Sequence, residues 1–207
     1  YNYMATGLGL TGLTAYFVAI TPSLFNAIYG TPFYWLVALA PLGFVFYLSA
    51  RLHKISFSTA QTVFWIFSGV MGLSMAYIFI AFTGASIARV FFITAGTFAG
   101  MSLYGYTTKK DLSGWGSFLF MGLIGIIIAS IVNIFLKSPM LYYVISWIGV
   151  LVFVGLTAYD TQRIKEMYYA SDHPEISGKK AIMGALKLYL DFINLFIMLL
   201  HLFGQRR

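Results

Sequence analysis

The sequence predicts an all-α membrane protein with seven transmembrane helices, and composition and hydropathy pattern carry that prediction. Of its 207 residues, 60% are apolar, 19% are aromatic and 9% are charged. A soluble domain carries about 25% charged residues to cover its surface, so a soluble fold is excluded. Disorder is excluded because disordered chains are poor in large apolar residues. Seven apolar runs, each near the length of about 20 residues that crosses a bilayer, follow one another with short connections.

Two prolines give local predictions for these runs. The second run contains Pro41, where we expect a kink, and the sixth starts at Pro139, which suits the first turn of a helix. Residue 1 is Tyr, so we expect the natural N-terminus to lie further upstream. The seventh helix ends near residue 203, and one seven-helix domain spans residues 1–207. We expect the first six helices over residues 4–20, 33–49, 57–82, 86–106, 112–135 and 139–163.

The basic residues indicate the orientation of the chain in the membrane. Loops that face the cytoplasm are enriched in Lys and Arg, so the side after the second, fourth and sixth helices should be cytoplasmic, as should the N-terminus. The net charge of +7 therefore reflects orientation and does not indicate a nucleic-acid partner. The absence of cysteine excludes disulfides and thiol catalysis. The basic residues on this side are Arg51, Lys54, Lys109, Lys110, Arg163, Lys165, Lys179 and Lys180.

Two acidic residues stand inside predicted membrane segments, where an ionisable group is costly and is a candidate for function. They are Asp160 and Asp191. The other four acids are expected outside the apolar interior: Asp172 and Glu175 in the last loop, Asp111 as a cap of the fifth helix, and Glu166 at the interface.

Lys187 suggests that the two aspartates lie at one depth. A lysine in this segment should extend its ammonium to the interface, so residues 188–205 would cross the membrane. Asp160 then lies three residues inside Arg163, and Asp191 lies four residues inside Lys187. The aspartates could share a proton or bind a cation. Alternatively, each pairs with its basic neighbour, because Lys187 and Asp191 are i and i+4 on one helix face.

Two segments resemble the Bax inhibitor family of transmembrane Bax-inhibitor-motif proteins, in a short form that looks like a bacterial, inner-membrane member. They are Ala158-Tyr-Asp-Thr-Gln-Arg-Ile-Lys165 and Leu188-Tyr-Leu-Asp-Phe-Ile-Asn-Leu-Phe196. The resemblance implies a seventh helix in the centre of the other six and a calcium leak controlled by pH. It implies no enzymatic activity, and calcium as a transported ion, not a cofactor.

The resemblance also implies roles for single residues. It places the family's paired, pH-sensing aspartates, which could contact calcium, on Asp160 and Asp191, and its latching arginine on Arg51. Lys187 stands where a small polar residue is common, and a cation there would compete with calcium, which makes it a possible modulator.

The physical chemistry of two adjacent carboxylates fits a pH switch. In a low-dielectric site both cannot ionise easily, so we expect them to hold one proton between them near neutral pH. Loss of that proton at higher pH would make them repel, loosen a cytoplasmic plug and open a path for calcium. The expected partners are calcium ions, protons and membrane lipid.

Three other functions remain open at the level of the sequence. Intramembrane aspartyl proteases also place two aspartates on consecutive helices, but the second follows Gly-x-Gly, whereas Asp191 follows Leu188-Tyr-Leu. A proton-coupled cation carrier is a second alternative, because acids in membranes serve as proton relays. The third is a non-conducting membrane protein that acts in interactions or stress responses.

Overall fold

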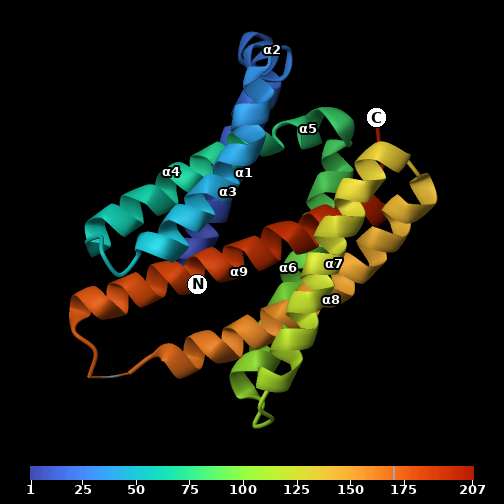
Figure 1. Ribbon diagram of the computed structural model, residues 1–207. Coiled ribbons are helices and arrows are strands. Elements are labelled where there is room, and N and C mark those ends of the chain that lie inside the picture. The colour runs from blue at the N-terminus through green and yellow to red at the C-terminus, as the bar shows by residue number, and fades with distance from the viewer. Residues whose placement is uncertain (170) are drawn as a thin grey trace. The chain divides into compact units, whose positions relative to one another are not determined.

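The computed structural model describes residues 1–169 and 171–207 and confirms an all-α membrane protein (Figure 1). Seven stretches in it are long and apolar enough to cross a membrane, as the sequence predicts. The described residues form nine helices because one span is divided and a short helix follows the first. These helices are α1 (Asn2–Ile20), α2 (Pro22–Tyr29), α3 (Phe33–Arg51), α4 (Phe57–Met75), α5 (Tyr77–Ala81), α6 (Gly84–Thr107), α7 (Ser113–Leu136), α8 (Pro139–Met167) and α9 (Pro174–Phe203).

The chain packs as two compact units. The first unit holds residues 1–83, 168–189 and 206–207, and the second holds residues 84–167 and 190–205, so α9 contributes to both. In the first unit α4 packs against α1 and α3, and α2 contacts both α1 and α3. In the second unit α8 packs against α6 and α7.

Helix α2 lies in a stretch that the sequence prediction left as a connection. Thr21, in extended conformation, precedes it, and Pro22 occupies its first turn, where a missing backbone N–H costs nothing. Eight residues are too few for hydrophobic periodicity to reveal a helix.

The predicted helix over residues 57–82 is in fact divided into α4 and α5, and Tyr29 explains the division. Its hydroxyl donates to the carbonyl oxygens of Leu73 at 2.8 Å and Ser74 at 3.0 Å, and it accepts the N–H of Tyr77 at 3.3 Å. A side chain inserted in this way interrupts the backbone ladder of a helix. Burial raises the pKa of Tyr29, so its hydroxyl keeps the proton that it donates.

Helix α9 begins earlier than the sequence prediction placed it. It starts at Pro174, so the prediction of Glu175 in a loop is wrong: Glu175 lies in the first turn of α9, where a carboxylate favours the positive end of the helix dipole. In the membrane-spanning stretch of α9, 67% of the residues are buried, against 11–39% in the other six. That α9 is central to the other six stays a prediction.

Two further local predictions concern Asp111 and Pro41. The N-cap position of α7 is Leu112 and not Asp111 as predicted, but Asp111 accepts the N–H of Ser113, the first residue of α7, at 2.8 Å. Hydrogen bonds from the side chain and then from the backbone N–H of Ser113 lower the pKa of Asp111. Helix α3 continues through Pro41 to Arg51.

Close backbone contacts depend on two glycines. A Cβ atom on Gly72 of α4 would lie 2.6 Å from the carbonyl oxygen of Thr11 in α1, and one on Gly105 of α6 would collide with the carbonyl oxygen of Ala158 in α8. Small residues permit such approach between membrane helices. A Cβ on Gly100, also in α6, would meet no described atom within 4 Å.

A buried hydroxyl network fixes α1, α4 and the start of α9 within the first unit. The hydroxyls of Thr11 and Tyr189 lie 2.5 Å apart, and Thr11 also lies within hydrogen-bond distance of the carbonyl oxygens of Gly7 and Ser68. The Tyr189 ring is fully buried and packs edge-on against Phe67. Its hydroxyl is therefore satisfied without water, as a polar group in an apolar interior must be.

We predict that Tyr29→Phe destabilises the protein. Without the hydroxyl, the Tyr77 N–H and the Leu73 and Ser74 carbonyls lose a partner, and each such loss costs about 1–3 kcal/mol if the gap does not close. The measurement is thermal unfolding of purified protein in detergent, with Tyr16→Phe, an exposed tyrosine, as control. An unchanged melting temperature in Tyr29→Phe would show that α4 and α5 simply rejoin.

We also predict opposite effects for alanine at two positions of α6. Gly105→Ala pushes a methyl group into the α8 backbone and should cost about 1–3 kcal/mol, the usual range for overpacking. Gly100→Ala meets open space and should be neutral, or stabilising by up to about 1 kcal/mol through helix propensity. Both are measured by thermal unfolding in the same detergent, and equal effects of the two substitutions would contradict the α6–α8 contact.

Candidate functional site

Asp191 is a carboxylate buried within an apolar helix. It lies in α9 and is 4% exposed. The next residue, Phe192, packs its ring edge-on against Phe91 and Phe98 of α6, with centroids 5.5 Å apart in both cases. This part of α9 is thus held by aromatic packing within the second unit. Burial of an acid at such a position is costly, which agrees with a functional role for Asp191.

Asp160 lies in α8, and its two neighbours in the sequence have different surroundings. It is half-buried. The preceding residue, Tyr159, lines the cavity described below. The following residue, Thr161, is buried and donates a hydrogen bond to Ser102 of α6 at 3.3 Å.

Both aspartates belong to the second unit, whereas Arg51 and Lys187 belong to the first. Arg51 is the last residue of α3 and is exposed, and Lys187 is partly exposed on α9. That Asp160 and Asp191 form a pair, that Arg51 latches it, and that Lys187 modulates it stay predictions.

Among residues 1–169 and 171–207, no three His or acidic side chains gather closely enough to hold a metal ion. Calcium takes six to eight oxygen ligands. Two carboxylates alone do not supply that number of ligands.

Gln162 fixes the loop between α6 and α7, a role that the sequence analysis missed. The Gln162 side chain is buried. Its amide nitrogen donates to the carbonyl of Lys110 and its amide oxygen accepts the N–H of Leu112, both at 2.8 Å. A glutamine one residue inside the arginine that ends the predicted sixth helix was the available signal, because such a polar group needs a partner.

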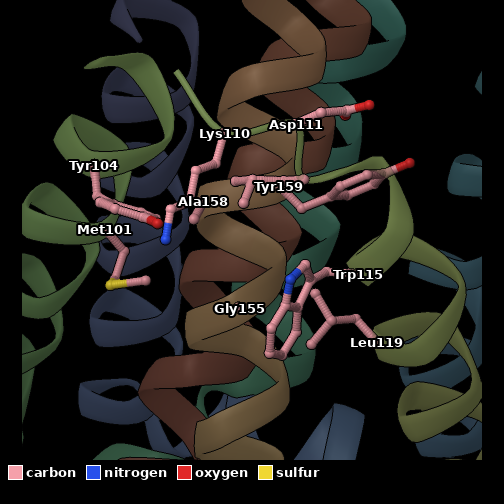
Figure 2. Close-up of a pocket in the computed structure, with 10 residues that line it drawn as sticks. Met101, Tyr104, Lys110, Asp111, Trp115, Leu119, Gly155, Ala158 and Tyr159 are labelled. Carbon is pink, nitrogen blue, oxygen red and sulfur yellow. The ribbon is translucent and has the colours of Figure 1, made fainter. Parts of the chain in front are cut away.

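A cavity of about 350 Å³ lies between α6, α7 and α8 and is bounded above by this loop (Figure 2). Its wall is mainly apolar and includes Met101 of α6, Leu119 of α7 and Gly155 of α8. Lys110 and Asp111 of the loop and Tyr104 of α6 also line it, and in Figure 2 the Tyr104 hydroxyl points toward Lys110, whereas the Tyr159 hydroxyl points away from the other lining residues.

Ion pairs lie near the end of α8, in the second unit, and near the start of α9, in the first. Arg163 pairs with Glu166 at 3.2 Å. Lys180 pairs with Asp172 at 2.6 Å, and this hydrogen bond lowers the pKa of Asp172. Glu166 and Asp172 thus each have a basic partner close by in the sequence.

Known proteins resemble the chain along its whole length. It matches the family described as inhibitor of apoptosis-promoting Bax1 over residues 1–207. It is 48% identical to the inner membrane protein YbhL of Escherichia coli over 210 residues, which cover 100% of this chain and 90% of that protein. It is 47% identical to protein RP147 of Rickettsia prowazekii, covering 100% of this chain and 88% of the other.

A more distant relative is a membrane protein of Streptococcus pyogenes, 36% identical over 208 residues that cover 99% of this chain and 90% of the relative. The segments around Asp160 and Asp191 had indicated the family, and the match extends over every helix described above. The chain therefore belongs to the Bax inhibitor family of membrane proteins.

Proposed function

We propose that this protein is a pH-sensitive calcium leak channel of a bacterial inner membrane, gated by Asp160 and Asp191. The observation that carries the proposal is the 4% exposed carboxylate of Asp191 inside a membrane-spanning helix. Membership of the family and the partly buried Asp160 on α8 support it.

The proposed gate depends on proton sharing between the two aspartates. When they hold one proton, a hydrogen bond between the carboxyls braces α8 against the second half of α9. When the proton leaves, two negative charges remain in a medium that screens them poorly, and repulsion of this kind amounts to several kcal/mol at close range. The closed packing is then disfavoured, and the same two carboxylates attract a divalent cation.

Arg51 and Lys187 are the proposed tuning groups. Arg51 would hold the closed state by pairing with an ionised aspartate. Lys187 would lower the local concentration of calcium, so that conduction through this protein is weaker than through a relative with a neutral side chain there. We propose no enzymatic activity for the chain, and no nucleic-acid partner.

We predict that calcium flux rises with pH and that this rise needs Asp191. Purified protein in liposomes that contain a calcium dye should admit calcium faster from pH 6 to pH 8, by at most about tenfold per pH unit, the limit for one proton. Asp191→Asn keeps the shape of the side chain but cannot ionise, so its flux should be independent of pH. Asp160→Asn should behave in the same way.

Glu175→Gln is the matched control, because Glu175 is an exposed acid of the same helix that pairs with Lys179 at 3.2 Å. It should keep the pH response of the wild type. The aspartate gate would be ruled out by a wild-type flux that does not change with pH, or by an Asp191→Asn flux that changes with pH as the wild type does.

The same liposomes separate the other functions. Flux that saturates at low calcium and requires a proton gradient would indicate a proton-coupled carrier. Absence of flux together with cleavage of a membrane peptide would indicate an aspartyl protease. If neither activity is present, a protein that acts through membrane interactions or in stress responses is the better interpretation.

The proposed orientation places the N-terminus and the basic loops in the cytoplasm. The chain contains no cysteine, so single cysteines can be introduced without removing any. Lys54→Cys and Lys109→Cys should react with a membrane-impermeant maleimide only after spheroplasts are opened. Lys137→Cys, in the connection between α7 and α8, should react in intact spheroplasts, and the reverse pattern would invert the proposed topology.

A further inference from the structure

The cavity in the second unit has an apolar wall and a polar end, the pattern of a site for an amphiphile. Its volume of about 350 Å³ corresponds to roughly a dozen methylene-sized groups, if each takes about the 30 Å³ of a water molecule in the liquid. That suits part of one acyl chain. Met101, Leu119 and Gly155 provide an apolar wall against which such a chain can pack.

The polar end consists of Lys110 and Tyr104, which come from the loop and from α6. Both line the cavity, and in Figure 2 the Lys110 side chain is directed toward Tyr104. Three ion pairs in the described part of the chain use Arg163, Lys179 and Lys180, and none of these three uses the Lys110 ammonium. An ammonium and a phenol hydroxyl together can donate several hydrogen bonds to an acidic group.

Hydrogen bonds hold the loop backbone at the site before any ligand binds. The Gln162 amide holds the backbone on both sides of Asp111, through the Lys110 carbonyl and the Leu112 N–H. The N–H of Lys110 also donates to the Thr108 hydroxyl at 3.2 Å. A loop held at three points loses little conformational freedom on binding.

The cavity opens where membrane lipid would be present. Tyr104 and Trp115, which line it, are 45% and 61% exposed. They lie in the last turn of α6 and the first turn of α7, beside the loop that joins the two spans. Exposed Trp and Tyr at span ends are typical of the membrane interface, so a lipid chain can enter from the bilayer while its head group stays at the surface.

We propose that this cavity binds an acyl chain with an acidic head group, the head group on Lys110 and Tyr104 and the chain against Met101, Leu119 and Trp115. Charge complementarity decides the class of ligand. Asp111 also lines the cavity, but its carboxylate accepts the N–H of Ser113 and points away from Lys110 in Figure 2. Basic sites between spans on the cytoplasmic side attract anionic lipid head groups for the same reason. The proposal does not depend on calcium conduction.

The test is native mass spectrometry of the purified full-length chain, released from detergent with phosphatidylglycerol, phosphatidylethanolamine or a long-chain fatty acid. The wild type should retain phosphatidylglycerol or the fatty acid in preference to phosphatidylethanolamine. Lys110→Gln should weaken that retention by about tenfold or more, as loss of a charged hydrogen bond does. Its fold should persist because the Gln162 contact uses the Lys110 backbone.

Lys109→Gln is the matched control, because it removes the same charge from the neighbouring residue, which is exposed and outside the cavity wall. It should retain lipid as the wild type does. Leu119→Trp fills the apolar wall and should reduce binding of the chain without changing the charge. Retention of the fatty acid and not of phosphatidylglycerol would assign the head group to a carboxylate, and the reverse result would assign it to a phosphate; both support the site.

Three results would overturn the proposal. Equal loss in Lys109→Gln and Lys110→Gln would reduce the effect to general surface charge. Equal retention of phosphatidylglycerol and phosphatidylethanolamine would rule out selection for an acidic head group. Unchanged retention in both Lys110→Gln and Leu119→Trp would place any bound lipid elsewhere.

Discussion

The structure depends on one constraint: a backbone N–H or C=O group without water must find a partner within the protein. Within each span, the hydrogen bonds of the helix supply these partners. Where a helix is interrupted, a side chain forms the hydrogen bond with the backbone group instead. The Tyr29 hydroxyl does so between α4 and α5, the Gln162 amide in the loop before α7, and the Ser86 hydroxyl at the end of α9, where it accepts the N–H of Gln205 at 2.8 Å. These polar residues are therefore as necessary to the architecture as the apolar surface around them.

Acidic side chains face a similar requirement, because a charge in an apolar interior also needs a partner. Acids near the ends of helices have local solutions, such as the pairing of Asp172 with Lys180 or of Glu166 with Arg163. Asp191 lies far from both ends of α9 and is nearly inaccessible, so the cost of a charge there depends on the groups packed around it. In the proposed gate, protonation of this group would act directly on the packing of the helices.

How much was visible in the sequence varies with the kind of feature. Long apolar runs located all seven spans, since the length and hydropathy of a span are properties of the segment itself. The division at Tyr77 depends on Tyr29, more than forty residues away in the chain, and no local pattern encodes it. Gly100 and Gly105 are both glycines of the same apolar span, yet only Gly105 lies against a neighbouring backbone. The sequence could not distinguish them, because a span that is apolar on all sides does not reveal which face is packed. The two aspartates were identifiable because charge is rare, whereas the cavity needed three helices in place.

Helix α9 has a consequence for the biogenesis of the protein. Residues 1–83 form a unit with residues 168–189 and 206–207, and the N–H of Arg207 donates to the carbonyl of Ala81. During synthesis the first five helices emerge long before these partners and must wait in the bilayer with part of their packing surface, including the Thr11 hydroxyl, uncovered. Packing of the first unit therefore cannot be completed until the last residues of the chain have been made, and a truncation that removes them would leave this surface uncovered.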